Sequence, residues 1–201
     1  MPDANDLLAL ADLEAHYNIA PGGADEPYLS SAITRASYDF YTYASRGAFD
    51  SALARGYANE FLGVQSYVGR FNGYNTNAIN LPVYPVFSVT SLVANDQTIV
   101  PSPDGVAYGY LFDEDEVQLV RGKFYRGFQN VSVSWTAGYT VPPPDLVGAV
   151  ELLVMSWYNR RKHIDVESET VNEQTRRYSG KKYPAEVEQT FERYRRKFPW
   201  S

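Results

Sequence analysis

The sequence predicts an α+β protein, a helical bundle that carries an inserted small antiparallel β-sheet or barrel. Apolar residues recur with the 3.6-residue period of a helix near both ends of the chain. Between them the period falls to two, as it does in strands. Neither helical block has much core alone, so we expect the two blocks to pack together around the insertion.

Two helices are expected in the first segment, residues 1–50. Residues 6–17 predict a short helix, because Leu7, Leu10 and Tyr17 fall on one side. Residues 26–45 predict a stronger one. Their apolar residues are spaced four and three apart and form one stripe: Leu29, Ile33, Ala36, Phe40 and Tyr43. Gly47 is available as the left-handed stop of this helix.

The connection over residues 51–78 has no single assignment. Ala52–Val64 fits a helix or a strand, and Gly69–Asn77 has the Gly and Asn content of an exposed loop. The β insertion is expected over residues 79–142. Its clearest strand alternates Val131, Val133 and Trp135 with Ser132, Ser134 and Thr136.

The second helical block covers residues 143–201. Asp145 caps a helix that ends near Arg160, a polar connection follows over 164–183, and Pro184 starts a last helix. Its apolar residues are spaced four, three and four apart: Val187, Phe191, Tyr194 and Phe198. A stripe about four turns long is marginal alone in water. It is buried either on its own domain or in a groove of a partner.

Composition excludes several classes of protein. The 201 residues contain no cysteine, which excludes a disulfide scaffold and a zinc-thiolate site and fits synthesis in a reducing cytoplasm. No apolar run approaches 18 residues, so no membrane partner is expected. Tyrosine is abundant at 17 residues. Tyrosine is favoured at surfaces that partners bury, but it also fills strands and cores.

No pattern of catalysis or cofactor binding is present. The two histidines, His16 and His163, stand apart, and neither GxSxG nor a phosphate-binding glycine motif occurs. The dense acidic cluster Asp113-Glu114-Asp115-Glu116 either binds a cation or forms a solvated turn between two strands, and the turn is the better interpretation. We therefore predict no enzyme, no cofactor and no metal.

Charge is placed unevenly along the chain, whose net charge is -6. Residues 1–64 hold nine acids and three bases, whereas eight bases and three acids follow from Arg176 onward. The basic tail interleaves its charges with tyrosines. It can bind phosphates and bases, dock on an acidic protein, or remain a solvated face. A small nucleic-acid-binding accessory protein is thus the alternative function.

The order of features resembles the phage head-tail connector, or adaptor, family, in a longer form with a β insertion. Two helices at 6–19 and 26–45 open such chains, and the sheet is flanked by short motifs. The similar stretches here are Ser45–Phe49, Leu81–Val89, Asn130–Tyr139, Val141–Leu146 and Ala149–Arg160. The resemblance covers nearly the whole chain, although the span from Ala52 to Asn80 is longer than the family pattern.

The resemblance implies a structural subunit of the virion neck, made in the bacterial host cytoplasm. Its homo-oligomeric ring, usually of twelve subunits, would lie beneath the portal protein and above a stopper or tail-completion protein. Double-stranded DNA would pass without sequence specificity. We predict that the tail from about residue 176 docks on the portal through Val187, Phe191, Tyr194, Arg195 and Phe198. The acidic turn Asp113, Glu114, Asp115 and Glu116 is predicted to face the channel.

Overall fold

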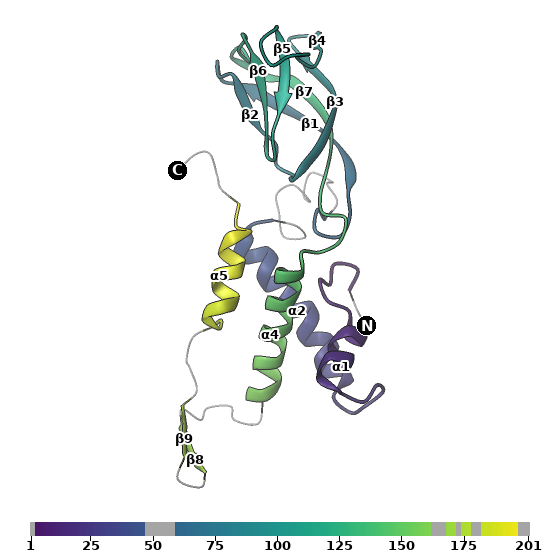
Figure 1. The fold of residues 1–201 in the computed structure, drawn as a ribbon, viewed down its shortest axis with the longest axis vertical. Coiled ribbons are helices and arrows are strands. Elements are labelled where there is room, and N and C mark those ends of the chain that lie inside the picture. Colours follow the sequence, from purple (N-terminus) through teal and green to yellow (C-terminus); the bar gives the residue numbers. More distant parts are fainter. Residues whose placement is uncertain (1–2, 47–58, 162–167, 172–173, 178–181, 197–201) are drawn as a thin grey trace. The chain divides into compact units, whose positions relative to one another are not determined.

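The computed structural model describes residues 3–46, 59–161, 168–171, 174–177 and 182–196. These residues fall into two compact units (Figure 1). The helical unit combines the residues up to Arg46 with those from Pro143 to Arg196, and the β unit covers 59–142. Helices and antiparallel sheets together confirm the α+β class.

The helical unit contains α1 (Leu10–Tyr17), α2 (Glu26–Ala44), α4 (Pro144–Arg160) and α5 (Ala185–Arg193). α2 ends at Ala44, three residues before Gly47, the expected stop, which lies outside the described residues. Ser45 takes the left-handed conformation instead, with φ 52°, and its N–H bonds to Tyr41 O. A non-glycine residue thus ends the helix, by the same hydrogen bonding that favours glycine.

The apolar stripe of α2 packs on α4, as its spacing predicts (Figure 1). Leu29, Ile33 and Phe40 are fully buried, and α4 buries Leu146, Val150 and Leu153. α4 is less enclosed than its composition suggests, because Leu152 is 44% exposed. The Arg35 guanidinium stacks 4.7 Å from the centre of the Trp157 ring, which covers another part of the helix.

The β unit contains two sheets with antiparallel strand pairs. One sheet has the order β1 (Gln65–Gly73), β7 (Gly127–Ala137), β3 (Val86–Ala94) and β4 (Gln97–Ile99). The other has the order β2 (Ala78–Asn80), β6 (Glu116–Val120) and β5 (Gly109–Phe112). The two sheets share a core that includes Trp135, whose Nε1 donates to Val83 O at 3.1 Å.

A loop was expected over residues 69–77. This expectation is wrong for residues 69–73, because they belong to β1. Tyr67 and Gly69 face inward beside Trp135 and Val133, so a strand forms despite the Gly and Asn content. Glycine at 73 serves a close approach, since a Cβ there would lie 1.9 Å from Tyr125 O. The sheet therefore starts at residue 65 rather than near 79.

The connection expected over 164–183 also contains a hairpin. β8 (Ser168–Val171) pairs with β9 (Gln174–Arg177) in antiparallel register. The stretch has no apolar alternation that would predict strands, because Val171 is the one apolar residue of the two strands. For Ala52–Val64 helix and strand were both open: residues 52–58 lie outside the described residues, and residues 59–64 form neither element.

Candidate interaction surfaces

The apolar stripe of α5 is buried within the helical unit. Val187 and Phe191 are fully buried, and the Phe191 ring centre lies 5.1 Å from that of Phe40 in α2. Of the two options that the spacing left open for these residues, the isolated chain therefore shows burial on its own domain. A short amphipathic helix gains stability wherever its stripe is covered, and here α2 and α4 cover it. Phe198 lies outside the described residues.

Basic and aromatic side chains near the end of α5 are paired within the unit. Tyr194 Oη donates to Asp145 Oδ1 at 2.6 Å, and Arg193 forms an ion pair with Asp145 at 3.1 Å. Arg195 meets Glu192 at 3.4 Å. Arg193 thus links α5 to the start of α4, and Arg195 pairs with a residue of α5. Both belong to the basic tail, for which docking on an acidic protein was one interpretation.

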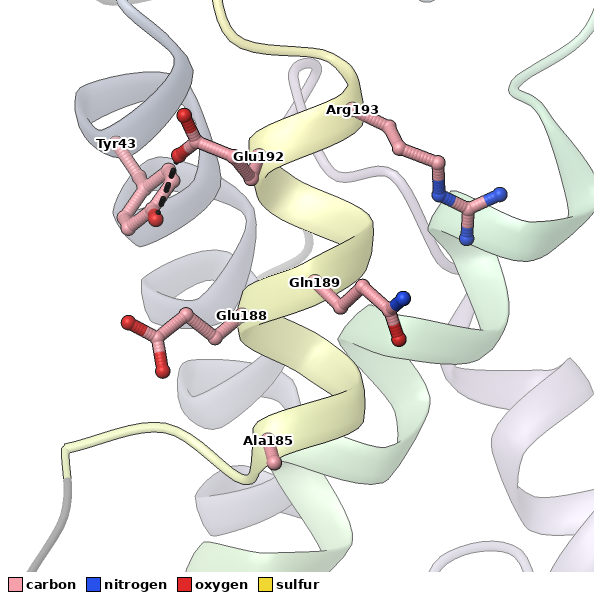
Figure 2. A pocket seen from close by; sticks show the side chains of 6 residues that line it. All are labelled: Tyr43, Ala185, Glu188, Gln189, Glu192 and Arg193. Carbon is pink, nitrogen blue, oxygen red and sulfur yellow. Dashed lines mark hydrogen bonds between the residues drawn. The ribbon is translucent and has the colours of Figure 1, made fainter.

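The outward side of α5 borders an open hollow of about 610 Å³ (Figure 2). In Figure 2, Glu188 and Glu192 project to the side of Tyr43, and Gln189 and Arg193 project to the other side. Tyr43 Oη donates to Glu192 Oε2 at 2.9 Å, and this hydrogen bond is the main cause of the raised pKa of Tyr43. With two exposed carboxylates, the hollow suits a cationic group.

The acidic turn Asp113–Glu116 closes the β5–β6 hairpin. Asp113 N donates to Glu116 O at 2.9 Å, and Asp113 Oδ1 accepts from Glu114 N at 2.7 Å. Asp113 and Glu114 are exposed, and no ion pair to the four carboxylates occurs within the described ranges. Among these residues no cluster of His, Cys, Asp or Glu is placed to hold a metal ion.

A second exposed surface of the β unit was not predicted from the sequence. The tip, defined as residues 121–128 together with Tyr74, exposes Arg121, Lys123 and Arg126. Tyr125 is 64% exposed and Phe128 is 82% exposed. No described carboxylate forms an ion pair with the three cations. The available signal was the stretch from Val117 to Pro144, which holds three bases and no acid.

The tip is held firmly by the rest of the β unit. Phe124 is fully buried, and its N–H donates to Thr76 O at 2.7 Å. The Asn130 side chain joins three segments: Oδ1 accepts from Gly73 N at 2.8 Å, and Nδ2 donates to Asn95 Oδ1 and Tyr125 O at 2.8 and 2.9 Å. A surface with fixed anchors loses less conformational entropy when a partner covers it.

His16 is the histidine that the structure describes, and it lies at the surface beside a carboxylate. His16 Nδ1 lies 2.6 Å from Glu151 Oε1 at the outside of the helical unit, and His163 lies outside the described residues. No described helix is long and apolar enough to cross a membrane.

Solved particle necks contain chains of the same fold. A chain in the neck of the empty gene transfer agent (GTA) particle, solved with C6 symmetry, is 19% identical, with 99% of this chain and 95% of that chain covered and a TM-score of 0.52. A chain of the native GTA neck with C12 symmetry is 16% identical over the same shares, with a TM-score of 0.51. No family model and no curated protein matches. The likeness shows a shared fold over nearly the whole chain.

Proposed function

We propose that this protein is a structural, non-enzymatic subunit of a phage head-tail connector ring in the neck of the virion. The observation that carries this proposal is the match over 99% of the chain to chains in GTA necks with C6 and C12 symmetry. Both symmetries suit a ring of twelve copies. A ring requires head-to-tail contacts, in which two different surfaces of each copy meet.

As an adaptor, the ring joins the portal protein on one side to a stopper or tail-completion protein on the other. The portal-docking element is the C-terminal segment from about Arg176. Because Val187 and Phe191 are buried, docking uses the outer side of α5, where the hollow beside Tyr43 offers Glu188 and Glu192 to a cation of the portal. Arg195 and the residues after Arg196 extend the same segment.

DNA passes through the bore of this ring without sequence-specific contacts. The net charge of -6 supports a channel that repels phosphate, so that DNA slides and does not adhere. The acidic turn Asp113–Glu116 is one candidate for the channel wall. The other candidate position for this turn in a ring is against a neighbouring copy.

The assembly experiment mixes the purified chain with purified portal protein and measures mass by sedimentation. We expect little association of the chain alone and a ring of defined mass on the portal. A chain that stays monomeric with excess portal contradicts the adaptor proposal. A chain lacking residues 182–196 is unsuitable as a binding control, because Phe191 belongs to the core. Glu188→Lys and Glu192→Lys test the hollow, with Glu186→Lys as the matched control outside it.

The alternative, a nucleic-acid-binding accessory protein, loses support because Arg193 and Arg195 pair with the chain's own carboxylates. Gel-shift titration at two salt concentrations separates the two functions. Binding of short duplex DNA that weakens steeply with salt would favour the alternative, whereas an adaptor is expected to show none at physiological salt.

A further inference from the structure

We infer that neighbouring copies meet through their β units, with the tip of one copy against the acidic turn of the next. This contact rests on the proposed ring and specifies one of its interfaces. It commits to a second copy of this chain as the partner of both surfaces. The reasons are the positions of the two surfaces in the β unit, their unpaired charges and their apolar content.

The two surfaces lie at opposite ends of β6. The acidic turn leads into this strand at Glu116, and the tip begins directly after Val120. At roughly 3.4 Å per residue, the strand separates its ends by about 14 Å. Surfaces at opposite ends of one unit cannot meet within the same chain. They can meet between copies in a head-to-tail arrangement, which is the arrangement that a ring requires.

Charges at the two ends are complementary. The tip presents Arg121, Lys123 and Arg126, and the turn presents four carboxylates, of which Asp113 and Glu114 are exposed. Two further exposed carboxylates lie in other loops of the β unit. Asp96 is in the β3–β4 turn, and Asp104 accepts the N–H groups of Val106 and Ala107 at 2.9 and 2.7 Å. The tip cations thus remain unpaired among the described residues.

Apolar groups accompany the charges at both ends. Phe128 and Tyr125 are mostly exposed at the tip, and Leu111 and Phe112 are 43% and 42% exposed beside the acidic turn. Exposed aromatic rings next to arginine are the composition of interface hot spots. Complementary charge then sets register and encounter rate, while burial of the rings supplies affinity. A DNA partner would use the cations but leave Leu111 and Phe112 unexplained.

The test uses matched charge reversals at exposed positions. The tip variant carries Lys123→Glu and Arg126→Glu, and the turn variant carries Asp113→Lys and Glu114→Lys. Arg121 is left unchanged because its φ is 53°, and Asp115 and Glu116 because they are half-buried. Circular dichroism and melting verify that each variant folds. Self-association on the portal, and at high concentration without it, is measured by sedimentation.

We expect each variant alone to weaken self-association at least about 10-fold, because like charges then face each other. The two variants mixed should assemble again, since each supplies the complement of the other, and so should one chain with all four changes. Phe128→Ala should weaken association without changing the melting temperature. Added salt should weaken the wild-type contact.

Four outcomes overturn the inference. If both variants form rings as the wild type does, the ring proposal stands but this contact does not. The acidic turn could then line the bore. Loss of association that neither mixing nor the fourfold variant restores would assign the charges to another partner. If the tip variant still forms rings but no longer binds a 20-base-pair duplex that the wild type binds, the partner of the tip is nucleic acid. A wild type that never associates, with or without portal, refutes both the ring and the contact.

Discussion

The helical unit and the β unit use their charged side chains in different ways. In the helical unit, Asp25 at the start of α2 accepts from Tyr158 Oη at 2.6 Å and pairs with Arg161 at 2.8 Å. These contacts join α2 to the end of α4, and Asp145 similarly joins α4 to the end of α5. Ionic groups here hold helices to one another.

In the β unit, the charged side chains of the tip and of the acidic turn form no ion pair among the described residues. The strands are held by backbone hydrogen bonds and by the buried side chains around Trp135. The charged side chains of the tip and of the acidic turn therefore contribute little to the fold. In this protein, paired charges thus mark contacts between helices of one unit, which we call joints. Unpaired charges beside exposed aromatic rings mark surfaces that a partner can cover.

The largest effect is expected in the helical core. Phe191→Ala removes a fully buried ring that packs on Phe40, which should lower the free energy of unfolding by about 3–5 kcal/mol. Urea denaturation measures this loss. Leu152→Ala, at an exposed position of α4, is the control and should change stability by less than about 1 kcal/mol. Unchanged stability of the Phe191 variant would return that ring to the role of a partner anchor.

Two glycines give opposite predictions in the two units. Gly73→Ala places a Cβ against Tyr125 O and should destabilise the β unit by about 1–3 kcal/mol or more, because Gly73 is held by strand pairing and Tyr125 O by the Asn130 side chain. Gly148→Ala lies in α4, where a Cβ would meet nothing within 4 Å, and should stabilise the helical unit by about 0.5–1 kcal/mol. Thermal unfolding of both variants checks the pair. Equal effects would contradict the close approach at the tip.

High pH should weaken the β unit through Tyr67. Burial, and secondarily Glu60, raise the pKa of its phenol to about 12, against about 10 in the unfolded chain. The folded unit therefore favours the neutral phenol. The stabilisation is complete below pH 10 and is lost as the pH rises from 10 to 12. Tyr67→Phe should show a smaller loss over this window in urea midpoints. Parallel curves for the two proteins would disprove the role of Tyr67.

The smallest effect is expected at the tip. Arg126→Ala should change the free energy of unfolding by no more than about 0.5 kcal/mol, since the side chain is exposed and unpaired. Arg161→Ala removes the same side chain from a joint, where it pairs with Asp25 and stacks 4.0 Å from the Tyr158 ring centre. That loss should be about 1 kcal/mol. Similar values for both arginines would remove the distinction between joints and open surfaces.

Sequence periodicity predicted the elements whose apolar spacing is regular. The helix expected at 26–45 is α2, and the strand expected around Val131–Trp135 is β7. It failed for β1, where Gly73 allows a close approach to Tyr125 O that no local pattern predicts. It also failed for the polar hairpin of β8 and β9, whose residues carry no alternation.

For the interaction surfaces, the sequence showed which residues need burial but not what buries them. The spacing of Val187 and Phe191 predicts a covered face equally well for a neighbouring helix and for a partner. The covering helix comes from residues about 150 positions earlier, at Phe40. The tip, in turn, combines loops that are distant in sequence, Tyr74 and 121–128, so only the folded arrangement reveals it.

The first and last long strands of the β unit, β1 and β7, are neighbours in the sheet. This arrangement has a consequence for the insertion or deletion of the unit during evolution. Gln65 and Ala137 are directly paired, and paired Cα atoms of antiparallel strands lie about 4.5–5.5 Å apart. Everything between them therefore leaves and returns at nearly one point. Excision of 66–136 with two or three glycines in its place would leave ends that meet without strain. The β unit is thus a module that a single insertion event can add to a helical ancestor, or a single deletion remove.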